Sequence, residues 1–309
     1  MIELNHVTYR YPFSDRNALE DISLTVRPGE AVLCTGVSGC GKSTLIRLIN
    51  GLCPHYFGGE LKGTVRVAGQ DNQTMKLHEI SSRVGTLFQN PESQFFALGV
   101  EEEMAFKPES RGMHPDKIRD LIAKTSQRFG LNSVLKNTIH ELSQGQKQKV
   151  GLASLMMEPL QVLILDEPTT GLDPQTRKVI WSVIEELRKK EQMTVFLTTH
   201  YMEEAATADY VVILDSGSIV AEGTPHELKE KYVEDYILLY GVTEDEVKLL
   251  GKKYKEIRDG YQLTVASTAE AAELIAANKD RFRDFEVVKG GMDDVFLTVT
   301  GKSLGGDEK

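Results

Sequence analysis

The chain has 309 residues, of which 40% are hydrophobic and 27% charged, a composition typical of a globular protein with a sizeable core. Its formal net charge of -10 disfavours nucleic acid as a partner, because a phosphate backbone attracts clustered Lys and Arg, but it does not disfavour a single nucleotide. No apolar run approaches the ~18 residues of a membrane helix, and the cysteines lack metal-binding spacing, so we expect a cytosolic chain that contacts membranes only peripherally.

The first part of the chain contains a strand, a glycine-rich loop and a helix, in that order. Ahead of them, Ile22, Leu24 and Val26 alternate with polar residues, which predicts an additional strand. Residues 31–34 are all apolar and predict a buried strand that enters the loop. Behind the loop, residues 45–49 have apolar side chains at helical spacing, so this segment begins an α/β unit.

Helical and strand-like segments then alternate. Residues 91–150 are mostly helical in pattern, whereas short apolar runs at 162–165, 195–198 and 210–214 predict strands. Pro174 suits the first position of a helix between the first two of these strands. The alternation predicts an α/β fold with a mostly parallel sheet that is covered on both faces.

A weaker boundary falls near Lys231 and separates a small α/β appendage from the core. Two strands and two helices are predicted in it, at 261–265, 285–288, 269–277 and 293–299. The predicted organisation is therefore a core domain over 1–230, with a helical subdomain at about 90–150, and an accessory domain over 231–309. The terminal GGDEK is expected to fray.

The glycine-rich loop matches the phosphate-binding pattern G-x-x-x-x-G-K-[ST] in its required context of strand before and helix after. Its glycines allow backbone N–H groups to wrap around a polyphosphate, and the helix N-terminus adds partial positive charge. Lys42 suits the β- and γ-phosphates and Ser43 suits Mg²⁺, whereas a glycine turn capped by Ser43 is the disfavoured alternative. The predicted phosphate-binding residues are Gly36, Val37, Ser38, Gly39, Cys40, Gly41, Lys42, Ser43 and Thr44.

Two carboxylates end the apolar run at 162–165. Successive strand residues point to opposite faces, so Asp166 and Glu167 are expected to do different work. Asp166 suits the Mg²⁺ shell, and Glu167 is the candidate to polarise an attacking water. A solvated pair of acids is the alternative, which the phosphate loop disfavours.

Three single residues are weaker candidates. His200 follows the strand at 195–198 and is placed to bridge a γ-phosphate and water, although a lone histidine is more often structural. Gln89 follows another apolar run, and its amide can ligate Mg²⁺ or contact water; in isolation it would be a loop residue. Tyr11 either stacks on an adenine or packs at the edge of a sheet.

The segment Leu142–Gln146 closely resembles the L-S-G-G-Q signature of ATP-binding-cassette (ABC) ATPases. Seven motifs occur in the family's order over most of residues 1–230, namely Tyr11, the phosphate loop, Gln89, the signature, Asp166-Glu167, the Gly171–Asp173 loop and His200. Gln144 stands where the family has its first signature glycine, and we expect activity to survive this difference.

This resemblance implies a P-loop NTPase core that binds ATP with Mg²⁺ and hydrolyses it. In the family the signature faces ATP held by the opposite subunit, so Ser143, Gly145 and Gln146 are expected to contact the nucleotide of a second ATPase chain, either identical or a paralogue. Asp173 would communicate between the two sites, or it simply caps the helix that begins at Pro174.

The resemblance further implies a separate integral membrane permease as partner and a peripheral position on the cytoplasmic face of the membrane. Residues 53–62 and 88–95 look like energy-coupling-factor importers, whereas the region from Met156 onward looks like ATPases of drug and lipid exporters, so direction and substrate stay open. In the family, residues after Gln89 receive a helix of the permease, and Phe95, Phe96 and Leu98 either line that groove or pack the subdomain core. A soluble ABC ATPase without a transport role is the rival interpretation.

Overall fold

The computed structural model describes residues 1–301, and the predicted frayed tail lies outside them. The chain divides into two compact units. Unit 1 comprises Met1–Tyr201 and Ala208–Val220, and unit 2 comprises Met202–Thr207 and the chain from Ala221 onward. None of the helices in the described residues is long and apolar enough to cross a membrane.

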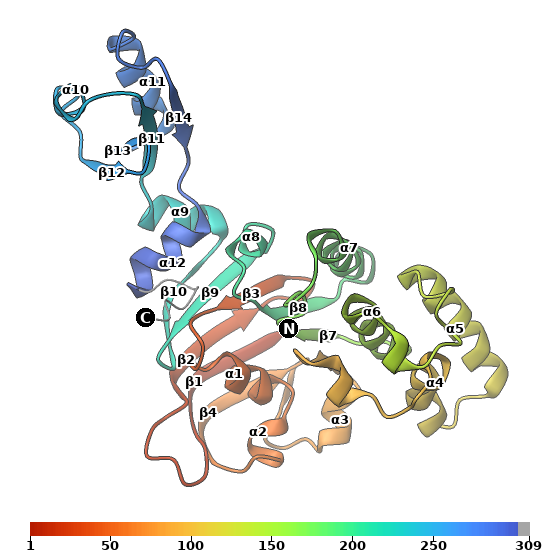
Figure 1. Ribbon diagram of the computed structural model, residues 1–309. Coiled ribbons are helices and arrows are strands. Elements are labelled where there is room, and N and C mark those ends of the chain that lie inside the picture. Colours follow the sequence, from red (N-terminus) through yellow and green to blue (C-terminus); the bar gives the residue numbers. More distant parts are fainter. Residues whose placement is uncertain (302–309) are drawn as a thin grey trace. The chain divides into compact units, whose positions relative to one another are not determined.

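A six-stranded sheet with the order β10-β9-β3-β8-β7-β6 is the centre of unit 1 (Figure 1). The pairs that join β9, β3, β8, β7 and β6 are all parallel, which confirms the predicted α/β fold. The strands are β3 (Ala31–Thr35), β6 (Val84–Leu87), β7 (Val162–Asp166), β8 (Thr194–Thr198), β9 (Tyr210–Asp215) and β10 (Ser218–Gly223). The apolar side chains of β3, β7 and β8 are buried on both faces, as expected for a parallel sheet between layers.

A second, antiparallel sheet of order β2-β1-β4-β5 was not predicted as a separate layer. Its strands are β1 (Ile2–Arg10), β2 (Leu19–Val26), β4 (Glu60–Val67) and β5 (Gln70–Asp71). Helix α1 (Lys42–Ile49) contacts both β4 and β7, so the hydrophobic core lies around α1 and joins the two sheets. Short helices α2 (Leu52–His55) and α3 (Leu77–Ser81) follow α1.

The predicted helical segment at 91–150 forms a cluster at a distance from α1 in unit 1 (Figure 1). Glu103 accepts hydrogen bonds from the backbone N–H groups of Phe96 and Ala97, both at 2.8 Å, and thereby fixes the entry to the cluster. The elements of the cluster are η1 (Pro91–Gln94), α4 (Val100–Ser110), α5 (Pro115–Phe129), η2 (Ile139–Glu141) and α6 (Gln144–Leu155). Helix α7 (Pro174–Glu191) follows later in unit 1, and the short α8 (Met202–Ala205) belongs to unit 2.

Unit 2 contains the order βαββαβ with a four-stranded antiparallel sheet β12-β13-β11-β14, which is a ferredoxin-like arrangement. Its elements are β11 (Asp235–Tyr240), α10 (Glu244–Lys248), β12 (Tyr254–Ile257), β13 (Gly260–Val265), α11 (Thr268–Ala277) and β14 (Phe285–Val288). The flanking helices α9 (Pro225–Tyr232) and α12 (Met292–Thr300) contact each other. Because α9 packs on α12, the structural division falls near residue 221 instead of the predicted 231.

Phe196 in β8 is fully buried in the core of unit 1, and this makes it a sensitive probe of packing. We expect Phe196→Ala to lower the free energy of unfolding by about 3–5 kcal/mol, because it removes buried surface and leaves a cavity. Urea denaturation followed by circular dichroism measures the change. Phe13→Ala is the matched control, since the Phe13 side chain is fully exposed, and it should change stability by less than about 0.5 kcal/mol.

Candidate functional site

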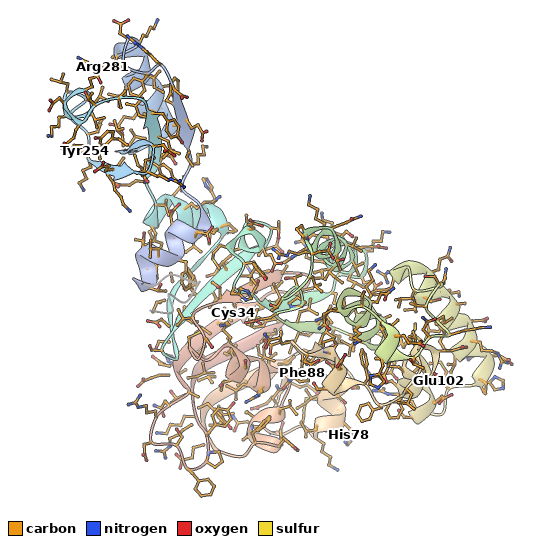
Figure 2. All side chains as sticks on the ribbon, in the orientation of Figure 1. Cys34, His78, Phe88, Glu102, Tyr254 and Arg281 are labelled. Atoms are coloured by element: carbon orange, nitrogen blue, oxygen red, sulfur yellow. The ribbon has the colours of Figure 1, made fainter. Side chains whose placement is uncertain are left out.

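The predicted site residues follow the carboxyl ends of adjacent parallel strands. The phosphate loop follows β3, Gln89 follows β6, Asp166 ends β7, and His200 follows β8. Cys34 in β3 and Phe88 after β6 are labelled in Figure 2 and mark two of these strand ends. Strands that are parallel and adjacent end at the same edge of a sheet, so the fold gathers residues that are far apart in the sequence.

The phosphate loop turns through glycines directly before α1. Gly39 and Gly41 have φ values of 79° and 115°, in a region that side chains other than glycine rarely adopt. A Cβ on Gly41 would approach the carbonyl oxygen of Ala18 to 2.9 Å, so the chain is also too close here for a side chain. The Lys42 ammonium donates to the carbonyl oxygens of Gly36, at 2.7 Å, and Val37, at 3.3 Å.

Two side chains of this loop differ in exposure. The Ser43 hydroxyl group belongs to an exposed side chain at the first turn of α1. The Cys40 side chain is buried in the core and packs toward Gly36. Burial raises the pKa of the Cys40 thiol, so only the backbone of this residue is available to a phosphate.

The Glu167 carboxylate is the centre of a polar cluster. Its Oε2 accepts hydrogen bonds from the Gln89 amide, at 2.9 Å, and from the Thr170 hydroxyl, at 3.2 Å. The Nδ1 atom of His200 lies 3.5 Å from the same oxygen. The fold therefore brings Gln89, Glu167 and His200 together from three strand ends, as the sequence motifs suggested.

The separation of Asp166 from Glu167 has a different origin from the predicted strand alternation. β7 ends at Asp166, and Glu167 adopts a left-handed backbone conformation with a φ of 48°. The Glu167 N–H donates to the backbone oxygen and to the hydroxyl oxygen of Thr198, both at 3.1 Å, and these bonds hold the strained turn.

Asp166 lies deeper than Glu167 in the site. Its Oδ1 accepts a hydrogen bond from the Thr198 hydroxyl at 2.7 Å. Burial raises the pKa of Asp166, against the opposing effect of that hydrogen bond, and the nearby Glu167 carboxylate raises it further. The positive charge of Lys42 partly offsets this by lowering the pKa of the same carboxyl group, so the loop lysine and Asp166 belong to one site.

The signature segment begins α6, as predicted. Ser143 is the N-cap residue: its hydroxyl oxygen accepts from the Gln146 N–H at 3.3 Å, and the Gln146 side chain accepts from the Ser143 N–H at 2.8 Å. Figure 1 shows α6 and α1 at separate places in unit 1, so a chain does not bring its own signature to its own phosphate loop.

Asp173 caps α7, which is one of its two predicted roles. Its carboxylate accepts from the N–H groups of Gln175 and Thr176, both at 3.0 Å, and from the Thr176 hydroxyl at 2.5 Å. A Cβ on Gly145 would meet the Thr176 Cγ2 at 2.4 Å, so the starts of α6 and α7 lie side by side.

The Tyr11 ring is half-buried against the core. Its hydroxyl accepts from the Arg47 guanidinium at 2.9 Å and lies 3.3 Å from the Thr44 hydroxyl. Its ring contacts Tyr9 edge-on with 4.9 Å between centroids. These contacts match the packing role considered for Tyr11, while adenine stacking stays a prediction.

Several residues that shape the site were missed by sequence reasoning. Thr170 and Thr198 hold the two acids, and the Tyr201 ring packs on His200 with 4.2 Å between centroids. An ion pair between Glu92 and Lys147 joins the segment after Gln89 to α6, and the hydrogen bond from Lys147 lowers the pKa of Glu92. Only the positions of the threonines, close to each acid or at the end of β8, offered a signal.

Comparison with known proteins supports this geometry. The ABC transporter family matches residues 19–170. An energy-coupling factor transporter ATP-binding protein, EcfA1, from Clostridium novyi is 38% identical over 232 residues, which cover 74% of this chain and 81% of that protein. A protein of Methanosarcina mazei described as an ABC transporter ATP-binding protein is 37% identical over 74% of this chain. The match covers 39% of that protein, so the chain spans only about two fifths of the length of several curated relatives.

Solved structures have the same fold. The structure of cbiO1 from Clostridium perfringens, described as part of the ABC transporter complex cbiONQ, is 27% identical, with a TM-score of 0.67 over 74% of this chain and 89% of that one. A dimeric ATP-binding cassette in a post-hydrolysis state with ADP and phosphate has a TM-score of 0.64 at 24% identity, over 72% of this chain and 98% of that one, and shows the fold alone. With the motif order, the strand-end geometry and the Clostridium novyi relative in agreement, the chain belongs to the ABC transporter ATP-binding family.

Proposed function

We propose that the chain binds Mg-ATP, pairs with a second ATPase chain around the nucleotides, and hydrolyses ATP to power transport through a separate membrane permease. The observation that carries this proposal is the cluster of Gln89, Glu167 and His200 beside the phosphate loop. A chain that only bound nucleotide would not need a carboxylate held by an amide and a histidine at the end of β7. Phosphate release from Mg-ATP by the purified chain is the direct test.

The proposed roles follow from the contacts. Lys42 donates to two carbonyls of its own loop, and phosphate oxygens would be stronger acceptors for the same ammonium. The contacts of Glu167 with Gln89, Thr170 and His200 all go to its Oε2 atom, so we expect Oε1 to accept the proton of the attacking water. Gln89 and His200 position that water and the γ-phosphate.

The proposed magnesium ligands fit the chemistry of the ion. Within residues 1–301 no group of three or more His, Cys, Asp or Glu could hold a metal by itself. Ser43, Gln89 and Asp166 offer one hydroxyl, one amide and one carboxylate oxygen, and Mg²⁺ is commonly held by one or two carboxylates together with substrate phosphates. When bound, Mg²⁺ neutralises charge that develops on the phosphates.

Asp166→Asn should raise the thermal stability of the chain while it lowers the rate of ATP hydrolysis. Because the folded pKa of Asp166 is raised, the folded chain binds this proton more tightly than the unfolded chain, and stability falls as the pH rises from the ordinary Asp range through the raised pKa. The penalty grows with pH up to the raised pKa, so at neutral pH the nucleotide-free variant should melt at a higher temperature than the original chain. Below about pH 3 this contribution should be nearly gone, since Asp166 is then mostly protonated in both the folded and the unfolded chain.

Thermal melting at neutral and acidic pH, together with phosphate release, checks this prediction. The variant should gain stability and lose Mg²⁺-dependent turnover. Asp120→Asn is the control, because Asp120 is exposed on α5 and should change neither property. Unchanged turnover in Asp166→Asn would contradict the assigned role.

The proposed second chain supplies the signature. Ser143 and Gly145 lie at the N-terminus of α6, where backbone N–H groups and the helix dipole favour a phosphate. Because α6 and α1 are separate in one chain, these residues are available to the nucleotide of another chain. The second chain is either an identical copy or a paralogue.

An exposed apolar patch on the helical cluster is the proposed docking place of the permease. The side chains of Phe96, Leu98 and Phe106 are 76%, 73% and 45% exposed, and the rings of Phe96 and Phe106 stack at 4.8 Å. Large apolar side chains that gather on a surface commonly mark an interaction site. Phe95 is half-buried and lies near Gly151 on α6, so it packs the subdomain. A permease partner places the chain peripherally on the cytoplasmic face of the membrane.

Phe96→Asp should weaken permease binding at least about tenfold, because it places a charge in an apolar contact. Phosphate release by the isolated chain should stay unchanged. Co-purification of detergent-solubilised permease with the chain measures the effect. Leu249→Asp, which changes a side chain 68% exposed in unit 2, is the control. Equal recovery of permease with both variants would rule out this patch.

A further inference from the structure

One face of the unit 2 sheet is covered by α10 and α11, and these two helices do not cover the opposite face. Ile237 and Leu239 in β11 are buried with residues of α10 and α11, so they point to the helices. Leu238 and Tyr240 alternate with these two residues along the strand. They therefore point to the opposite face, and they are partly exposed. At the start of β11 the second face is bordered by α9 and α12, because Lys231 and Asp294 line one hollow together with Tyr236.

The strand register arranges charges on this open face. Lys255 pairs with Gln262, Gln262 with Leu238, and Leu238 with Glu286, so these four residues form one row across the four strands. Lys253 and Lys255 therefore share the β12 edge, and Asp284 and Glu286 share the β14 edge. The face has one basic edge, one acidic edge and a centre that contains Leu238, Tyr236 and Tyr240.

The charges on both edges are available to a partner. In residues 1–301 the side chains of Lys253, Lys255, Asp284 and Glu286 make no ion pair. Desolvation raises the pKa of Tyr240, and the carboxylates of Glu286 and Asp284 raise it further, which is consistent with their position on the same face as this ring. The pattern disfavours nucleic acid, because the acidic edge would repel phosphates.

We propose that this open face pairs with the same face of a second copy of the chain, around a two-fold axis that runs parallel to the strands. Such an axis lies between β13 and β11 and places β12 of each copy over β14 of the other. Lys255 of one copy then meets Glu286 of the second copy, and the contact occurs twice. The row makes the face self-complementary, which is the requirement for an interface with two-fold symmetry.

The contact is small. Four strands 4.8 Å apart and about five residues long present roughly 300 Å² per copy, whereas a stable interface buries about 800 Å² per partner. The sheet contact alone is therefore weak, and it becomes populated when two copies are already held together, which raises their effective concentration. This step rests on the proposed ATP-bound dimer.

A cysteine cross-link tests the pairing in the full chain. We expect Lys255→Cys combined with Glu286→Cys, in a Glu167→Gln background that retains ATP, to form a covalent dimer on mild oxidation. Within one chain these positions lie on the outermost strands, about 14 Å apart, beyond the ~7 Å limit for a disulfide. The native Cys34, Cys40 and Cys53 are buried, so they should not compete.

The control moves each cysteine by one residue to the other face of the same strands. Glu256→Cys with Val287→Cys changes two exposed positions, and it should cross-link at least about tenfold more slowly. Equal rates for the two cysteine pairs, with an ATP-dependent dimer visible by sedimentation, would overturn the sheet pairing and leave the proposed function intact. Absence of any ATP-dependent dimer would instead contradict the proposed function, and with it the sheet pairing that depends on the ATP-bound dimer.

Charge reversal gives an independent readout. In chains without added cysteines, Lys255→Glu and Glu286→Lys should each weaken dimerisation about 5- to 20-fold, because each change creates two like-charge contacts. Sedimentation measures this association. An equimolar mixture of the two variants, or one chain with both changes, should recover the original association. Loss without recovery would contradict the assigned pairing, and Glu256→Lys should have no effect.

Discussion

Glu167→Gln is expected to lower the rate of ATP hydrolysis by about 10²- to 10⁴-fold, the range for loss of a general base. The glutamine has nearly the same shape, and its side-chain oxygen can still accept from the Gln89 amide, so the site should keep its geometry. ATP binding should persist, and two chains should stay closed around the nucleotide. Phosphate release and sedimentation in Mg-ATP measure the two effects.

The control for this prediction is Glu109→Gln, which makes the same chemical change at an exposed position on α4. It should hydrolyse ATP at the original rate. If Glu167→Gln also did so, Glu167 would not be the base. If it lost ATP binding as well as turnover, the carboxylate would be holding the site together and not only activating water.

The strand ends carried most of the predictable information. Parallel strands of Val, Leu and Ile are recognisable because they are buried on both faces, and the polar residue that follows each one must lie at a common edge. Asp166, Gln89 and His200 could therefore be placed together from the sequence. The conformation of Glu167 could not, because its φ of 48° depends on bonds from its backbone to Thr198, 31 positions away.

Unit 2 was less predictable for a different reason. β11 is apolar on both faces, with Leu238 and Tyr240 opposite Ile237 and Leu239, so it has no polar alternation to identify it as a strand. α10 has only five residues and β12 only four, and both are mostly polar. Their assignment depends on pairing with β13 and on packing, which a local pattern does not contain.

Contacts between distant elements could not be predicted from local sequence patterns either. Glu92 and Lys147 are 55 positions apart, and nothing near either residue indicates the other. In the structure their ion pair links the segment after Gln89 to the signature helix α6.

Each ATP site is expected to take Lys42 from one chain and Ser143 from the other. Lys42→Ala should lower turnover more than about 100-fold, because it removes a positive charge that the site presents to the phosphates. Ser143→Asp should be similarly inactive. Asp is as good an N-cap as Ser, so α6 should stay folded, but its carboxylate would repel a phosphate.

Mixing these two inactive variants should restore activity. In a mixed pair, one site receives both changes and the other receives neither, because each site takes its lysine from one chain and its serine from the other. With random pairing, half of the pairs are mixed and have one intact site, so about a quarter of the original turnover should return if the sites act independently. Phosphate release by an equimolar mixture measures this.

The matched control is a mixture of Lys42→Ala with Glu167→Gln. These two residues belong to the same side of the site, so every mixed pair keeps one defect in each site and no activity should return. Recovery in the first mixture and not in the second would distinguish a shared site from general stabilisation of one variant by the other. If Lys42→Ala and Ser143→Asp formed dimers yet did not recover activity together, a site completed by the second chain would be wrong, since a site within one chain is inactive in both variants.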